Sequence, residues 1–415
     1  MFKIKTSRRQ FLGGFAALPS FNLFSPRALA GRPEDRLVHD YYAELGVEPF
    51  INAVGPYSSL GGAKMWPEVI DAMAYAIENK ARMTDIHDAV GKRIAELLTA
   101  EAAMVTSGAT GALMLATAAC MTMGDLEKNE RLPDTTDMAN EVIILKSQRY
   151  LYDRSIRAPG AKLVEIESIS QATDAINDKT AMLFFLLNRS DETGIDVQGY
   201  IRIAKQYGIP ILCDAATTVP PVKKIAETVR AGFDLICYSG GKGLRGPYSA
   251  GLLLGRKDLI GYARQHASPN HRAYGRSMKV APEEYLGMMV AVETSLNFDE
   301  EKEYQRQLDL VDYMGRELSG LNGVSVSTHV PAEEAREPYI EVNWDERYAI
   351  SPGGVKQLLR DGKPCIEIRA LFLSGGRLHL TASMLEESQA PVIVKRIKEI
   401  LDANAKNRLG RLEST

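Results

Sequence analysis

Residues 238–247 read Tyr-Ser-Gly-Gly-Lys-Gly-Leu-Arg-Gly-Pro and follow directly on the apolar run that begins at Leu235. The apolar run predicts a short buried strand, and the glycines after it allow another group to approach the backbone closely. Lysine is most often a solvated surface residue, but Lys242 lies between glycines where a buried strand ends. We therefore interpret Lys242 as an amine that another chemical group must reach.

Two other expected strand ends carry residues of complementary chemistry. Residues 105–112 pass from strand to helix through Ser107, Gly108 and Ala109, and bare N–H groups at a helix N-terminus bind phosphate well. This signal is weak by itself, because serine and glycine also cap ordinary helices. Asp214 ends a later apolar run, either as a helix cap or as the partner of a cation held at the edge of the sheet.

From about residue 67 onward, short apolar runs alternate with helical stretches. The runs of strand length are residues 102–106, 142–145, 162–166, 182–187, 209–213, 235–238 and 251–254. Continuous apolar strands that alternate with helices are typical of a mainly parallel sheet covered on both faces. We therefore predict an α/β large domain that binds its ligands at the carboxyl ends of the strands.

Several helices and loops are also expected from local pattern. Pro67 can open a helix, since proline is tolerated at the first helical position. Residues 88–100 are amphipathic with helical spacing, and Asp88 is a plausible cap. Residues 127–140 are acidic and polar and are interpreted as a surface loop, whereas residues 283–320 have a helical pattern.

The pattern changes after Gly323 to short strands with two helices, which indicates a smaller α+β domain. The expected strands of this domain are residues 324–327, 339–342, 366–370 and 377–380. The whole chain is divided into a signal segment (1–30), an N-terminal arm (31–66), a large domain (67–298), a connecting helix (299–321) and a small C-terminal domain (322–415).

The N-terminus differs in charge from the rest of the chain. Residues 1–30 hold five basic residues and no acid, with the Arg8–Arg9 pair before Phe-Leu, an apolar stretch and Ala28-Leu-Ala30. This order resembles a twin-arginine export signal. We therefore expect a periplasmic protein handled by the twin-arginine export machinery; the alternative is a basic tail on a cytoplasmic enzyme.

Charge and composition exclude several classes of protein. The chain of 415 residues has a formal net charge of −3, and residues 31–415 alone, with 45 basic against 53 acidic side chains, carry −8. An acidic surface is poorly suited to DNA or tRNA, so no nucleic-acid partner is expected. No run approaches the ~20 apolar residues of a membrane-spanning helix. The four cysteines lie in apolar contexts, which favours buried free thiols.

Taken together, the three strand ends match one cofactor. A phosphate cradle, then an acid, then a lysine 28 residues later is the order in a pyridoxal-phosphate (PLP) enzyme with an aspartate-aminotransferase-like large domain. In such enzymes lysine condenses with the cofactor, and the acid keeps the pyridine nitrogen protonated so that the ring withdraws electrons.

Further stretches carry a family resemblance. They are residues 51–57, 60–62, 91–97, 105–112, 214–216, 239–247 and 275–280. On these stretches the chain resembles the selenocysteine synthase (seryl-tRNA selenium transferase)-related family of fold type I, particularly its D-glucosaminate-6-phosphate ammonia-lyase-like branch. The resemblance extends over about residues 46–385.

The resemblance implies roles for individual residues. Lys242 is implied as the Schiff-base lysine and proton carrier, and Asp214 as the partner of the pyridine nitrogen. The residues implied around the ring and the phosphate are Ala216, Ser107, Gly108, Ala109 and Ser239. The residues implied near the substrate are Tyr57, Arg149, Arg276, Lys279 and Arg369, and Tyr152 belongs to a segment implied to lie near the ring.

Some of these roles have alternatives. Arg369 is implied as the clamp on the substrate carboxylate, and its alternative is a structural salt bridge. Arg276 and Lys279 are implied to meet a substrate acid, or the cofactor phosphate across a dimer interface. His87 either acts in the site or is a cap or surface residue. No residue spacing suggests a metal site.

The function expected from the residues and the resemblance is that of a PLP-dependent lyase, homodimeric or of higher order. Its substrate is a small anionic amino-acid-type compound, either an amino acid or an amino-sugar acid, from which α,β-elimination releases a keto acid and ammonia. The alternatives are a racemase or aminotransferase, selenium or sulfur transfer to an aminoacyl-tRNA, and a non-catalytic binding protein. Thr381 and Ser383 stand where relatives often have Asp and Arg, which leaves the substrate open.

Overall fold

The computed structural model describes residues 39–189, 196–331, 337–371 and 376–406, and the expected export signal lies outside these ranges. The chain divides into two compact units, Met1–Glu48 and Pro49–Thr415. In the first unit the described residues form the short helix α1 (Tyr41–Leu45), which Asp40 caps and Gly46 ends in a left-handed conformation. The second unit contains a large and a small domain.

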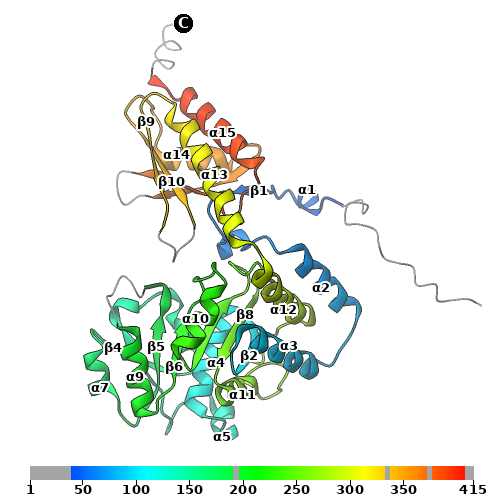
Figure 1. Cartoon of the computed structure of the whole chain (residues 1–415), viewed down its shortest axis with the longest axis vertical. Helices are drawn as coiled ribbons and strands as arrows, with labels where there is room; N and C mark the ends of the chain where they lie inside the picture. The colour runs from blue at the N-terminus through cyan, green and yellow to red at the C-terminus, as the bar shows by residue number, and fades with distance from the viewer. Residues whose placement is uncertain (1–38, 190–195, 332–336, 372–375, 407–415) are drawn as a thin grey trace, which may run out of the picture. The chain divides into compact units, whose positions relative to one another are not determined.

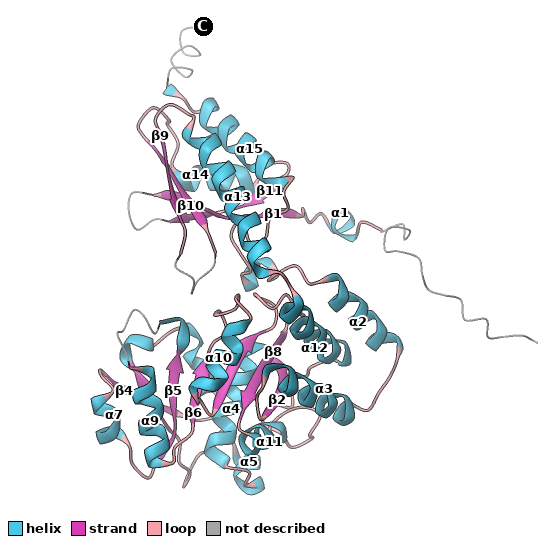
Figure 2. Cartoon of the chain, viewed as in Figure 1, coloured by secondary structure: helices cyan, strands magenta, loops and turns pink. Residues whose placement is uncertain are grey.

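A seven-stranded sheet forms the centre of the large domain (Figures 1 and 2). Its strands are β2 (Ala102–Ser107), β3 (Glu141–Leu145), β4 (Lys162–Ile166), β5 (Thr180–Leu186), β6 (Ile211–Asp214), β7 (Leu235–Ser239) and β8 (Ala250–Gly255). The spatial order is β2-β8-β7-β6-β5-β3-β4, with β8 antiparallel to both neighbours and the other pairs parallel. The predicted mainly parallel α/β sheet is confirmed.

Both faces of this sheet are apolar because helices cover each of them. On β6, Ile211 and Cys213 belong to one core cluster, while Leu212 between them belongs to the other. The first cluster includes residues of α3, α9, α10 and α12, and the second includes residues of α4 and α11. Burial on both faces explains why these strands are continuous apolar runs rather than alternating ones.

The helices of the large domain agree with the expected pattern except at two places. They are α2 (Pro67–Glu78), α3 (Met83–Leu98), α4 (Gly108–Thr122), α5 (Leu126–Arg131), α6 (Arg154–Arg157), α7 (Ser170–Ala175), α9 (Val197–Tyr207), α10 (Lys223–Ala231), α11 (Lys257–Gln265) and α12 (Pro282–Asn297). Short 3-10 turns occupy Ser58–Leu60, Lys146–Gln148, Leu151–Asp153 and Leu187–Arg189.

The two exceptions have physical reasons. The predicted cap at Asp88 is wrong, because α3 already begins at Met83 and Asp88 instead forms an ion pair of 2.5 Å with Arg264. The predicted loop at 127–140 is wrong in its first part. There Asp125 accepts from the N–H groups of Glu127 and Lys128 and so starts the helix α5.

The small domain is a four-stranded sheet covered by helices on one face. Its strands are β9 (Val324–His329), β10 (Tyr339–Trp344), β12 (Arg369–Leu371) and β13 (Arg377–Thr381), in the order β12-β13-β10-β9 with antiparallel pairs. The covering helices are α13 (Glu300–Ser319), α14 (Pro352–Arg360) and α15 (Gln389–Ala403). The expected single strand at 366–370 is two strands, since β11 (Cys365–Glu367) belongs to another sheet.

The N-terminal arm contributes a strand to the small domain. β1 (Phe50–Asn52) pairs in parallel with β11, and its neighbour Ala53 is hydrogen-bonded to Glu367 and Thr381 across 3.0 Å each. Ala53 is fully buried in the small-domain core. The residues after Ala53 return to the large domain, where the Ala63 N–H donates to the Gly241 carbonyl at 2.8 Å. The arm therefore connects the small domain to the loop after β7 that contains Lys242, which is called the lysine loop below.

The four cysteines are buried free thiols, as predicted. Within the described residues, no helix is both long and apolar enough to cross a membrane.

Candidate active site

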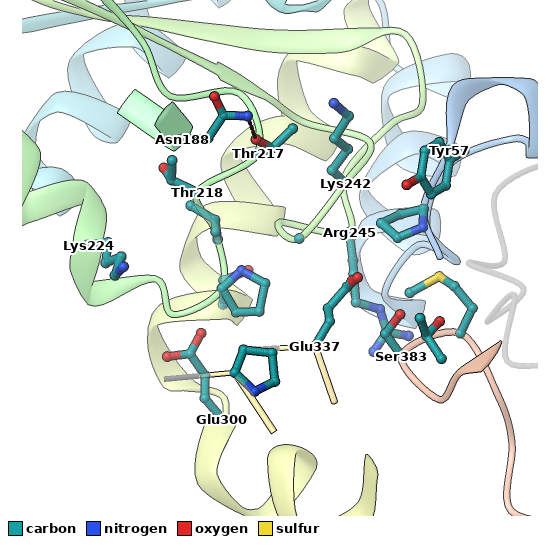
Figure 3. A pocket seen from close by; sticks show the side chains of 18 of the residues that line it. Tyr57, Asn188, Thr217, Thr218, Lys224, Lys242, Arg245, Glu300, Glu337 and Ser383 are labelled. Carbon is teal, nitrogen blue, oxygen red and sulfur yellow. Dashed lines mark hydrogen bonds between the residues drawn. The ribbon is translucent and has the colours of Figure 1, made fainter. Parts of the chain in front are cut away.

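A cavity of about 1170 Å³ is lined by residues of both domains and of the arm. The large domain contributes Lys242 and Thr217, the small domain contributes Arg369 and Ser383, and the arm contributes Tyr57. Figure 3 shows part of this lining. Clefts that combine apolar walls with a few polar groups are typical of small-molecule sites.

Lys242 lies in the loop that follows β7, as the sequence predicts, and its side chain lines the cavity. The Lys242 ammonium group makes no hydrogen bond or ion pair with any residue that the structure describes. Burial lowers the pKa of its ammonium group, and the nearby Asp214 carboxylate acts in the opposite direction. A less stable ammonium favours the neutral amine, which is the form that condenses with a carbonyl.

Glycines bring this loop against its neighbours. A side-chain carbon on Gly243 would lie 2.0 Å from the Val219 carbonyl oxygen, and one on Gly62 would lie 2.5 Å from the Gly241 carbonyl oxygen. Neither contact is possible for a larger residue without moving backbone. The glycines that suggested close approach therefore do serve it, although the approaching groups are segments of the chain itself.

Asp214 ends β6, the strand beside β7, and is only 4% exposed. Its Oδ1 accepts from the Ala216 N–H at 2.9 Å and from the Cys237 thiol at 3.6 Å. The part of the chain that the structure describes supplies no ion pair to this carboxylate. A buried carboxylate is costly unless a cation or several donors compensate it, so Asp214 is suited to hold a cation.

Tyr150 is a site residue that the sequence analysis missed. Its hydroxyl donates a hydrogen bond to Asp214 Oδ2, and burial together with that carboxylate raises the pKa of the phenol, which keeps it protonated. Tyr150 lies between the 3-10 turns Lys146–Gln148 and Leu151–Asp153, which follow β3. Its neighbours Arg149 and Tyr152 were singled out from the same segment, but nothing in the pattern distinguishes which tyrosine faces Asp214.

The expected phosphate-binding residues gather at one edge of the sheet. Ser107, the last residue of β2, pairs with Ala250, and Ser239, the last residue of β7, pairs with Gly251. Both serines therefore flank the start of β8. Gly108 begins α4 with a φ of +68°, and the first N–H groups of a helix have no partners within it. This edge has the donors that a phosphate requires.

Arg369 and Tyr57 come together across the cavity. The Arg369 guanidinium lies 5.4 Å from the centre of the Tyr57 ring, a cation–π arrangement between the small domain and the arm. Glu337 also lines the cavity; burial raises the pKa of its carboxyl group, while Ser383 and Arg369 oppose this. Arg369 makes no salt bridge within 4.0 Å to a described acid.

Of the other residues that the resemblance implies, one lines the cavity and three do not. Arg149 forms ion pairs with Asp153, at 2.6 Å, and with Glu165, so acids of this chain already occupy its guanidinium. Arg276 and Lys279 lie in the loop between α11 and α12, and they are not among the described residues that line the cavity. Tyr152 does line it.

His87 is buried away from the cavity lining, contrary to the alternative of a cap or surface residue. Its Nδ1 lies 3.0 Å from the Tyr285 hydroxyl and close to the Arg264 guanidinium, in the packing of α3 against α11 and α12. Burial and the Arg264 charge lower its pKa to about 3, so the ring is neutral near pH 7. Among the described residues, no His, Cys, Asp or Glu cluster could hold a metal ion.

These residues fit PLP. Asp214 supplies a buried carboxylate for a protonated ring nitrogen, and Lys242 supplies an amine with no described partner. Ala216, the residue expected against the ring, follows Asp214 by two positions and donates its N–H to the Asp214 carboxylate. The serines at the ends of β2 and β7, with Gly108 and Ala109, supply phosphate donors.

Comparison with known proteins agrees with this fit. The family model for class-V aminotransferases matches residues 72–274. The chain is 28% identical over 375 residues to a Streptomyces 5′-C-glycyluridine monooxygenase-decarboxylase, covering 87% of this chain and 92% of that protein. It is 27% identical over 376 residues to D-glucosaminate-6-phosphate ammonia lyase of Salmonella typhimurium, covering 87% and 98%.

A solved structure of D-glucosaminate-6-phosphate ammonia-lyase superposes with a TM-score of 0.78 at 26% identity, covering 89% of this chain and all of that chain. The chain therefore has the fold of the PLP-dependent, fold type I enzymes, and it is similar to class-V aminotransferases over residues 72–274.

Proposed function

We propose that this protein is a PLP-dependent lyase that eliminates a β-substituent from a small anionic amino-acid-type substrate and releases a keto acid and ammonia. The observation that carries the proposal is the pair formed by Asp214, a buried carboxylate without a described cation, and Lys242, a half-buried amine on the neighbouring strand end. When bound, the cofactor supplies an electron-withdrawing ring that makes the Cα–H bond of an amino acid acidic.

Three residues of the chain would bind the cofactor and the substrate and transfer the proton. The Asp214 carboxylate, oriented by the Tyr150 hydroxyl and the Ala216 N–H, would hold the pyridine nitrogen protonated. Lys242 Nζ would take the Cα proton of the substrate, because its pKa is lowered by burial and it has no described partner. Arg369, backed by the Tyr57 ring, would hold the substrate carboxylate.

One comparison favours elimination over the other reactions of this cofactor. The D-glucosaminate-6-phosphate ammonia lyase is similar to this chain along nearly the whole length of that enzyme. The second relative is named for a different reaction at similar identity, so the reaction needs a direct test. Purified, PLP-loaded protein should release ammonia and keto acid from a panel of D- and L-amino acids and amino-sugar acids. Racemisation or amino transfer without ammonia release would overturn the lyase proposal.

We also propose that the protein acts outside the cytoplasm as a homo-oligomer. The Arg8–Arg9 signal supports export, and transport of a folded protein would let the cofactor be loaded before export. A Lys-Lys substitution at Arg8 and Arg9 should retain the protein in the cytoplasm, as measured by cell fractionation. Unchanged export would contradict the twin-arginine route.

A further inference from the structure

Arg245, three residues after Lys242, is held in a fixed conformation at the cavity wall. Its backbone has a φ of +51°, and its N–H donates to the Lys242 carbonyl at 2.8 Å. Its Nε donates to the Lys64 carbonyl at 2.8 Å, and its guanidinium lies 3.7 Å from the centre of the Trp66 ring. A strained backbone at a ligand cavity is often maintained for function.

The Arg245 cation lacks a compensating anion. Among the described residues no acid lies within ion-pair distance of Arg245, and its two Nη atoms make no hydrogen bond. Glu303 is the acid whose charge interacts most strongly with the Arg245 guanidinium. Both Glu303 oxygens, however, already accept hydrogen bonds from Arg306, at 2.6 and 2.8 Å, and one also accepts from Gln307. Burial lowers the pKa of the Arg245 guanidinium. A partly buried cation without a compensating anion is costly, and an anionic ligand would reduce this cost.

The position of Arg245 separates it from the expected cofactor phosphate. Ser107 and Ser239 flank the start of β8, and neither belongs to the described cavity lining, whereas Arg245 does. In Figure 3 the side chains of Lys242 and Arg245 leave the same loop in opposite directions. Arg245 is therefore placed to meet the part of a substrate that lies away from the cofactor.

We propose that Arg245 binds a second anionic group of the substrate, a carboxylate or a phosphate distant from the reacting carbon, while Arg369 binds the first. Both guanidinium groups line one cavity, and each lies against an aromatic ring, Trp66 or Tyr57. The ring contact fixes each cation while leaving its N–H edge free for a planar or tetrahedral anion. The cavity exceeds the ~300–1,000 Å³ of ordinary ligand pockets, which suits an extended substrate.

This inference rests on the proposed function and assigns the substrate class to doubly anionic amino-acid-type compounds. It is tested with the holoenzyme by comparing kcat/KM for amino acids with an acidic side chain, amino acids with a phosphorylated side chain and amino acids with a neutral side chain. The ratio of anionic to neutral substrate should fall about 10- to 100-fold in Arg245→Met, as expected for a lost charge-assisted hydrogen bond. Arg245→Lys should lose less, since it keeps the charge.

Arg272→Met is the matched control. Arg272 is exposed, pairs with Glu130 at 2.7 Å and is outside the described cavity lining, so its replacement should leave the ratio unchanged. The class of anionic substrate whose kcat/KM falls more in Arg245→Met identifies the group that Arg245 binds as a carboxylate or a phosphate. A wild-type preference for neutral side chains, or an unchanged ratio in Arg245→Met, would overturn the inference.

A second measurement on the wild-type protein guards against misfolding of the variants. Phenylglyoxal modification of Arg245, mapped by mass spectrometry, should slow when inorganic phosphate or succinate is added but not when a neutral amino acid is added. Equal rates with all additions would overturn the inference. Failure of the wild-type protein to bind PLP would instead overturn the proposed function, so the two failures are distinguishable.

Discussion

At the residue scale, Asp214 shows how a buried carboxylate can be kept ready for a cation. Three donors surround it, namely the Tyr150 hydroxyl, the Ala216 N–H and the more distant Cys237 thiol. Hydrogen bonds to the charged form of an acid favour that form. These three hydrogen bonds compensate part of the free-energy cost of removing the Asp214 carboxylate from water. Since no described residue supplies a cation to this carboxylate, a pyridinium can take that place.

Replacing Tyr150 tests this arrangement. Tyr150→Phe removes the donor to Asp214 Oδ2 and should weaken PLP binding about 10- to 150-fold, because a hydrogen bond to a charged group is worth ~1.5–3 kcal/mol. Spectroscopic titration of the apoprotein with PLP measures the effect. Tyr274→Phe is the control, since its hydroxyl donates to the Ala158 carbonyl and does not contact Asp214. Equal affinities for PLP in the two variants would contradict the assigned role of Tyr150.

His87 predicts a dependence of stability on pH. Its pKa is lowered to about 3 in the folded protein, against an unfolded value of about 6.5, so the unfolded chain binds more protons between these values. The stability that neutral His87 contributes is complete above about pH 6.5 and is lost progressively as the pH falls toward 3. Between pH 7 and 5 the loss is up to about 2 kcal/mol.

The His87→Gln variant checks this dependence. Glutamine keeps a polar group beside Tyr285 but does not titrate, so the decrease in unfolding free energy between pH 7 and 5 should be smaller than in the wild-type protein. Urea unfolding at both pH values measures the decrease. Part of it should remain, because burial also lowers the pKa of His266 and of His379, each to about 4. If the unfolding free energy of His87→Gln decreased between pH 7 and 5 as much as that of the wild-type protein, His87 would not be the titrating group.

At the scale of elements, the site depends on how closely β8 passes the start of α4. A side-chain carbon on Gly251 would lie 2.4 Å from the Gly108 carbonyl carbon and 2.7 Å from the Ala109 nitrogen. Only glycine allows the strand and the helix N-terminus to be this close. The edge where phosphate binding is expected is therefore a product of packing between two elements that are distant in sequence.

Gly251→Ala should destabilise the protein by about 1–3 kcal/mol, the usual cost of overpacking, and should weaken PLP binding by moving the start of α4. Gly261→Ala in α11 is the matched control. Nothing lies within 4 Å of a side-chain carbon there, so alanine should stabilise the protein by about 0.4–1 kcal/mol. Thermal unfolding of both variants measures the effects, and a Gly251→Ala protein as stable as Gly261→Ala would contradict the packing argument.

Elements with strong, continuous patterns were predictable, and those decided by single contacts were not. The strands ending at Ser107, Asp214 and Ser239 were found because burial on both faces makes them apolar throughout. The helix α5 was missed because its composition is polar and its start depends on the Asp125 cap. Strand β1 has three residues and forms only by pairing with β11, a contact more than 300 positions away.

At the scale of the whole molecule, the site is assembled from three segments that are far apart in the sequence. The lysine loop, the arm around Tyr57 and the small-domain strand with Arg369 meet only because β1 joins the small domain while Ala63 binds the Gly241 carbonyl. The sequence order of phosphate cradle, acid and lysine predicts the residues of the cofactor half of the site, and their roles stay a prediction. It could not predict that Tyr150 reaches Asp214, that Arg149 pairs with acids of its own neighbourhood, or that Arg245 lacks an anion.

Mapping the lysine to which PLP attaches is the decisive measurement for the proposed role of Lys242. The purified chain, loaded with PLP, reduced with borohydride and digested, should yield one modified peptide, with the cofactor mass on Lys242. Lys242→Ala should lose the visible absorbance of the bound cofactor, lose this label and lose activity. Attachment at another lysine, or a Lys242→Ala protein that keeps the absorbance and full activity, would contradict the account.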